Sequence, residues 1–130
     1  MNVSRLLATG FVAAIAVPLV LTAPAQAKGS DATIREGSCS GSTDWKVKVK
    51  PDDGRLEFEG EIDSNKVGQT WNWVLKHNGT RSASGTATTR APSGSFSIER
   101  RVVNLSGVDK LVFKATNPRS GETCRGVVSR

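Results

Sequence analysis

The 130-residue chain has no tyrosine, one histidine and two cysteines, and these shortages exclude several kinds of site. Because His77 is the only histidine, neither a multi-histidine metal site nor a two-histidine acid–base mechanism can be built. Cys39 and Cys124 lack the CxxC spacing of zinc and redox sites. No GxSxG, HExxH or P-loop pattern occurs. We therefore expect no catalytic residues, no metal ligands and no cofactor, and hence a protein that is not an enzyme.

Long apolar runs are also scarce, and the one present lies at the N-terminus. Residues 6–21 (LLATGFVAAIAVPLVL) follow a short segment with one positive charge and precede the small-residue motif Ala25-Gln26-Ala27. This arrangement predicts a secretory signal peptide over residues 1–27. An uncleaved anchor is the weaker alternative, because a membrane span needs about 20 apolar residues. We expect a secreted, extracellular monomer that has no contact with the membrane after cleavage.

The mature chain is long enough for one domain. Residues 28–38 (KGSDATIREGS) are polar and aperiodic, so we expect a flexible lead-in, followed by a single domain over 39–130. An exported chain with two cysteines most simply forms one disulfide, Cys39–Cys124, near the ends of the mature chain.

Hydrophobic residues alternate with polar ones almost throughout, and turn residues recur about every ten positions, which is typical of an all-β sandwich. We count about seven strands. In the first hairpin, a four-residue loop over 51–54 would pair Val49 with Leu56, and would place Trp45 opposite Gly60. The alternation slips near Arg100 and Arg101, where we expect a bulge.

Trp71 and Trp73 raise the main question of function. They lie two residues apart on a predicted strand, so they share one face. Asn78-Gly79 then predicts a two-residue hairpin turn, with His77 exposed beside it and a polar edge strand returning. A small sandwich needs its large side chains in the core, so we expect both tryptophans to be buried. The alternative is a sugar-stacking platform in which Trp71 is exposed.

Charge is unevenly distributed. Residues 28–63 contain six basic and nine acidic residues, whereas residues 64–130 contain eleven basic and three acidic ones. The basic part could bind an extracellular polysaccharide, a cell-wall polyanion or nucleic acid. The candidate residues are Arg81, Arg90, Arg100 and Arg101. Alternatively, these arginines form a solvated surface that only keeps the protein soluble.

The stretch VDKLVFKATNPRSGETC resembles the penultimate strand and following hairpin of immunoglobulin-like and fibronectin-type domains, through Asp109, Ala115, Asn117 and Gly121. The resemblance implies an immunoglobulin-like antiparallel β-sandwich. The chain departs from that pattern in lacking the corner tyrosine and in placing its cysteines near its ends. Four segments of the chain are similar to small secreted actinobacterial proteins, a resemblance that implies no activity. The segments are CSGSTDWKVKVKPDDGR, HNGTR, TTRAPSGSF and GETCRG.

Our leading hypothesis is a non-catalytic secreted binding or structural module that uses the loops at residues 51–54, 64–68, 91–94 and 118–121. One alternative is a carbohydrate- or cell-wall-binding module that uses an exposed Trp71. Another is a secreted hydrolase inhibitor that presents Arg119 on the NPRSGE loop.

Overall fold

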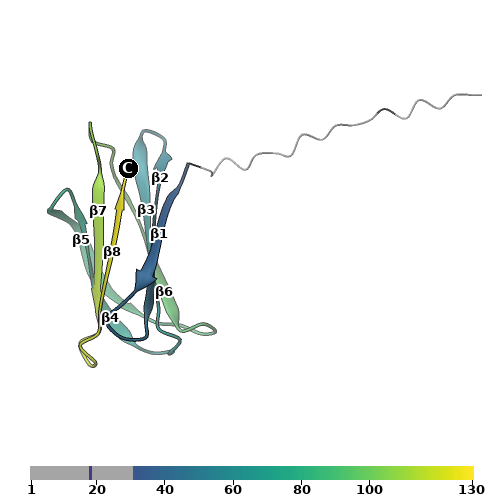
Figure 1. Cartoon of the computed structure of the whole chain (residues 1–130), viewed down its shortest axis with the longest axis vertical. Coiled ribbons are helices and arrows are strands. Elements are labelled where there is room, and N and C mark those ends of the chain that lie inside the picture. Colours follow the sequence, from purple (N-terminus) through teal and green to yellow (C-terminus); the bar gives the residue numbers. More distant parts are fainter. Residues whose placement is uncertain (1–17, 19–30) are drawn as a thin grey trace, which may run out of the picture.

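The computed structural model describes Pro18 and residues 31–130, and residues 31–130 form an all-β sandwich (Figure 1). The predicted signal peptide, Pro18 apart, lies outside the described residues, as do residues 28–30 of the predicted lead-in. In the described part of the chain, no helix has the length and hydropathy needed to cross a membrane.

Eight strands form two antiparallel sheets of four. The strands are β1 (Thr33–Ser38), β2 (Asp44–Asp52), β3 (Arg55–Asp63), β4 (Thr70–His77), β5 (Thr80–Thr88), β6 (Ser95–Val103), β7 (Lys110–Thr116) and β8 (Thr123–Ser129). Sheet A has the order β1-β2-β3-β6, and sheet B has the order β5-β4-β7-β8. The predicted antiparallel sandwich is confirmed, with one strand more than expected.

The additional strand is β1, so the prediction of a flexible lead-in is wrong for Thr33–Ser38. This segment carries no apolar alternation because it lies at the edge of sheet A, where only one of its backbone edges is paired. Its register on β2 is continuous, from Thr33 opposite Val49 to Ser38 opposite Asp44. Backbone hydrogen bonds hold such a strand without help from its side chains, which is why the sequence pattern missed it.

The core lies between the sheets and contains the residues that the alternation predicted. From sheet A it takes Val47, Val49, Leu56, Phe58 and Ile62, and from sheet B it takes Trp71, Trp73, Leu75, Leu111 and Phe113. The Phe113 ring lies 5.9 Å from the Phe58 ring and 6.2 Å from the Trp73 ring, centroid to centroid. Phe113 therefore joins the two sheets at the centre of the sandwich.

The two tight hairpins show where turn chemistry decided the register. Asn78 and Gly79 have φ values of 48° and 85°, which confirms the predicted left-handed turn. The first hairpin turns in the same way on Asp53 (φ 47°) and Gly54, so its loop has two residues and not four. Val49 therefore pairs with Phe58, not with Leu56. A shift of two residues leaves every side chain on its predicted face, so the core is unchanged.

The expected bulge near Arg100 is wrong, because β3 and β6 pair without a shift. The break in alternation arises because Arg100 occupies an inward position on the edge strand β6. Its guanidinium carbon lies 4.9 Å from the centroid of the Trp73 ring. A cation can cover the face of an indole in this way, so the arginine closes the edge of the core where a hydrophobic residue was expected.

At the opposite edge, a covalent bond and a ring close the gap between β1 and β8. Cys39 and Cys124 form the predicted disulfide. The Trp45 ring lies against Gly37 and Gly126, where a Cβ atom would approach it to 2.5 and 2.7 Å. Trp45 therefore covers these two glycines rather than Gly60, which lies under Phe113.

Candidate functional site

The outer face of sheet B gathers basic side chains from all four of its strands. Because Trp71, Trp73 and Leu75 point into the core, the alternate residues of β4 point outward, and the same alternation holds along β7 and β8. On β5, Ala83 and Ala87 pack against the core, and a register shift opposite Leu75 and Lys76 brings Arg81 opposite Lys76. The outward cations are Lys76, Arg81, Lys110, Lys114 and Arg125. None of the four strands contains an aspartate or a glutamate. This cation cluster therefore has no carboxylate on its own sheet to neutralise it.

The register places like charges directly opposite each other in two neighbouring rows. In one row Arg81 of β5 pairs with Lys76 of β4. In the next row Lys114 of β7 pairs with Arg125 of β8. Like charges in such positions destabilise a sheet by roughly 0.2–1 kcal/mol per pair. Like charges also lie opposite each other on sheet A, in Asp44–Asp63 and Glu59–Glu99, but there lysines of β2 lie on the same face, whereas the strands of sheet B offer no opposite charge.

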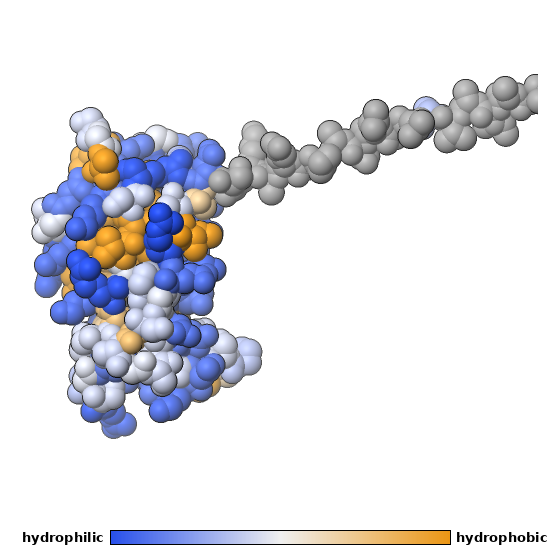
Figure 2. All heavy atoms as spheres, in the orientation of Figure 1, coloured by the Kyte–Doolittle hydropathy of each residue, from blue (hydrophilic) through white to orange (hydrophobic). Residues whose placement is uncertain are grey.

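Two valines form the floor between these charges. Val112 lies opposite Lys76, and Lys114 lies opposite Val74, so cations and valines alternate in a checkerboard at the centre of the sheet. Together with Gly79, the five cations and two valines line an open groove of about 550 Å³. We call Lys76, Arg81, Lys110, Lys114, Arg125, Val74 and Val112 the basic face. Figure 2 shows hydrophobic surface over β7 and β8, crossed and bordered by hydrophilic residues.

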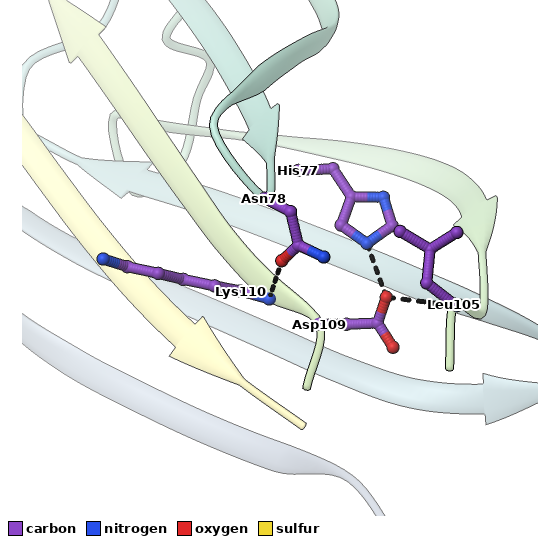
Figure 3. Close-up of polar contacts among 5 residues, drawn as sticks. All are labelled: His77, Asn78, Leu105, Asp109 and Lys110. Carbon is purple, nitrogen blue, oxygen red and sulfur yellow. Dashed lines mark hydrogen bonds and ion pairs between the residues drawn. The ribbon is translucent and has the colours of Figure 1, made fainter. Parts of the chain in front are cut away.

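A polar cluster, exposed at Asn78 and buried at Asp109, fixes one end of the basic face (Figure 3). Asn78 Oδ1 accepts a hydrogen bond from the backbone N–H of Lys110 at 2.7 Å, which ties the β4–β5 turn to β7. Behind it, His77 Nε2 and Asp109 Oδ1 lie 2.6 Å apart, with side chains only 10% and 2% exposed. Asp109 Oδ1 also accepts from the backbone N–H of Leu105. The expectation that His77 is exposed is therefore wrong, since it anchors the β6–β7 loop.

A second cluster fixes the opposite end of sheet B. Glu122 accepts hydrogen bonds from Thr43 Oγ1 at 2.5 Å and from Thr43 N at 3.1 Å. Burial raises the pKa of the Glu122 carboxyl, but the hydrogen bonds from Thr43 and Gly41 and the charge of Lys66 outweigh it, so the pKa is lowered. This ionised carboxylate joins the β7–β8 loop to sheet A beside the disulfide, outside the basic face.

The arginines singled out from the sequence do not form one patch. Arg81 belongs to the basic face. Arg100 lies over Trp73, and Arg101, on the other side of β6, has its Nη2 2.9 Å from Asp52 Oδ2. Arg90 lies at the start of the β5–β6 connection, where its backbone forms an isolated antiparallel β-bridge with Ser95. Arg119 lies exposed in the β7–β8 loop.

Both tryptophans of the opening question lie in the core. Trp71 is fully buried and Trp73 is 3% exposed, so the sugar-platform alternative is wrong. The sequence singled out none of the other four cations of the basic face, which are Lys76, Lys110, Lys114 and Arg125. The sequence does show basic residues at outward positions of several strands that lack acidic residues. It does not show that these strands are neighbours, and only the strand order, with β7 beside β4, brings the basic residues together.

Comparison with known proteins gave no matching family model, no matching curated protein and no matching solved structure. Among residues 31–130, no three His, Cys, Asp or Glu side chains lie close enough to hold a metal ion together.

Proposed function

We propose that this protein is an exported, non-catalytic β-sandwich module that binds an extracellular polyanion through the basic face. The carrying observation is the set of five outward cations on four strands that contain no acidic residue. A field of one sign attracts a partner of the opposite sign and speeds its association. At physiological salt the Debye length is about 8 Å, so only a partner lying directly on the face feels all five charges.

The composition of the basic face supports a polyanion without bases more than a single-stranded nucleic acid. Proteins that hold single-stranded nucleic acid usually stack bases on exposed aromatic rings. The aromatic residues of the four strands are Trp71, Trp73 and Phe113, and all three lie in the core. The valine floor offers apolar contact without a stacking surface.

The rest of the molecule supports export and an immunoglobulin-like class. The disulfide is the kind of bond that persists in oxidising compartments. The connections β3–β4, β5–β6 and β6–β7 each pass from one sheet to the other, as in Greek-key sandwiches. The resemblance to secreted actinobacterial proteins stays a prediction.

The test is retention of the mature chain, residues 28–130, on immobilised heparin, a sulfated linear polysaccharide. We expect the chain to bind at low salt. The slope of log K against log salt should approach about −0.7 to −0.9 per neutralised charge. The double reversal K76E/R125E should weaken binding by about tenfold or more, because it removes two attractions and adds two repulsions.

The matched control is R90E/R119E, which changes the net charge by the same amount at exposed positions outside the basic face. It should retain most of the affinity. If both double variants lose affinity equally, net charge and not the basic face carries the binding. Absence of retention at low salt would contradict the proposal outright.

A second candidate, a hydrolase inhibitor, is favoured by one observation. Asn117 is 4% exposed and its Oδ1 accepts from the backbone N–H groups of Arg119 and Ser120, which makes the exposed loop rigid. A panel of secreted hydrolases assayed with wild type and with R119A tests this candidate. Inhibition that R119A abolishes would favour it over the polyanion proposal.

A further inference from the structure

The outer face of sheet B has a second half that carries hydroxyl and amide groups instead of charges. Its members are exposed or half-exposed and lie toward the disulfide end of the same four strands. They are Thr70, Asn72, Thr86, Thr88, Thr116 and Thr123. None is ionisable, so this half of the face is neutral while the basic face next to it is cationic.

Four of these residues form one row across the whole sheet. Asn72 of β4 pairs with Thr86 of β5 on one side and with Thr116 of β7 on the other. Thr116 pairs in turn with Thr123 of β8. We call Thr86, Asn72, Thr116 and Thr123 the hydroxyl row. Neighbouring strands lie about 4.8 Å apart, so the row spans roughly 14 Å.

The hydroxyl row runs parallel to a row of the basic face. The adjacent outward row contains Val74, which pairs with Lys114, which pairs with Arg125. Two residues along a strand separate the rows, a distance of about 6.7 Å. A linear ligand that crosses the strands over Lys114 and Arg125 therefore lies within reach of the hydroxyl row along its length.

The hydroxyl row keeps hydrogen-bonding capacity toward solvent. Thr86 Oγ1 donates to Asn72 Oδ1 at 3.2 Å. This bond uses one donor and one acceptor site, whereas a hydroxyl has one donor and two acceptor sites and an amide has two donors and a carbonyl oxygen. The Asn72 NH₂ group and the Thr86 lone pairs can therefore bind a hydroxyl-bearing ligand.

We infer that the polyanion bound by this face is a linear polymer whose anionic groups are carried on hydroxyl-bearing units, either saccharides or polyols. The inference rests on the proposed function and adds the chemistry of the ligand. The anionic groups lie over Lys114, Arg125 and Lys76, and the ligand hydroxyls lie over the hydroxyl row. A phosphodiester of a polyol and a carboxylate of an acidic sugar share this chemistry.

The experiment measures affinity at physiological salt for three probes of matched charge number. Polygalacturonate carries carboxylates on sugars, poly(glycerol phosphate) carries phosphodiesters on a polyol, and inorganic polyphosphate carries charge without hydroxyls. We expect at least one hydroxyl-bearing probe to bind about fivefold or more tighter than polyphosphate, which corresponds to one or two added hydrogen bonds. Which of the two binds tighter identifies the anionic group.

The variant T86V/T116V removes two hydroxyls of the row and keeps side-chain shape and strand propensity. It should weaken binding of the preferred probe roughly 5- to 10-fold and leave polyphosphate binding unchanged. The control T80V/S97V changes two exposed hydroxyl residues outside the row and should change neither affinity. Melting temperatures of both variants show that any loss is not a folding defect.

The inference and the proposed function fail in different ways. Equal affinity for all three probes, or no effect of T86V/T116V, overturns the inference. If K76E/R125E still weakens binding in that case, the proposed function stands. If K76E/R125E has no effect on any probe, both are overturned.

Discussion

The two outer faces of the sandwich are built on the same alternation but handle charge in opposite ways. The strands of sheet A contain eight acidic and seven basic residues, whereas the strands of sheet B contain five basic residues and no acidic ones. On sheet A, cations mostly lie opposite carboxylates: Lys48 is opposite Glu59, and Lys50 Nζ lies 3.9 Å from Glu57. On sheet B, four of the five cations lie opposite another cation, and Lys110 lies opposite Ser129. Sheet A also has two acidic pairs, Asp44 with Asp63 and Glu59 with Glu99, but lysines share its outer face, whereas the strands of sheet B contain no carboxylate side chain.

The inner faces do not differ in this way, since both sheets contribute fully buried hydrophobic residues. Stability and binding should therefore separate by face. Inner-face changes should affect stability and leave the charge pattern intact. Outer-face changes on sheet B should affect binding at little or no cost in stability.

Replacing Trp71 with alanine should reduce the free energy of unfolding by roughly 3–5 kcal/mol, because the ring is fully buried. Trp71→Phe should cost clearly less. The indole Nε1 has no hydrogen-bond partner among the described residues, so only ring size is lost. Urea unfolding of both variants checks this. Equal losses would show that the indole N–H contributes to stability.

Arg100 and Arg101 are neighbours that serve different faces, so their alanine variants should differ. Arg100→Ala removes the cation over Trp73 and should cost about 0.5–1 kcal/mol. It should also increase iodide quenching of the tryptophan fluorescence. Arg101→Ala removes an exposed pair with Asp52 and should cost less, with quenching unchanged. Quenching that rises equally in both variants would contradict the assigned position of Arg100.

Neutralising one lysine should change stability in opposite directions on the two sheets, because Lys114 lies opposite a cation and Lys48 lies opposite a carboxylate. Lys114→Gln relieves the repulsion with Arg125 and should stabilise the domain by roughly 0.2–0.5 kcal/mol while weakening polyanion binding. Lys48→Gln leaves Glu59 without its opposite charge and should destabilise by a similar amount. Thermal unfolding at low salt shows both effects best. Changes of the same sign would break the comparison between the sheets.

The smallest effect concerns pH. The lowered pKa of Glu122 means that the ionised carboxylate stabilises the fold at pH values above its ordinary, unfolded pKa. This contribution is lost as the pH falls through the lower, folded pKa. The melting temperature of Glu122→Gln should therefore depend less on pH than that of wild type below about pH 4.5. Parallel curves for the two proteins would contradict this role.

The sequence predicted the inner faces well and the outer site poorly, for a physical reason. Alternation reports which side of a strand is buried, and it correctly placed Trp71, Phe58 and Phe113 in the core. The predicted faces also stayed correct in the first hairpin, where the predicted register was wrong, because a shift of two residues keeps each side chain on the same face. Alternation does not report which strands are neighbours. Lys76 and Lys114 become one site only because β7 pairs with β4, across a long stretch of chain.

An amide chemical-shift titration of residues 28–130 with polygalacturonate oligomers tests directly whether the basic face binds a polyanion. We predict that shifts concentrate on residues 74–81, 110–116 and 123–125, in the strands of sheet B and the β4–β5 turn, and that they diminish as salt is raised. The amides of β2 and β3 in sheet A should change little. Shifts concentrated on sheet A or confined to the end loops at residues 64–68 and 118–121 would contradict the account, as would no shifts at low salt.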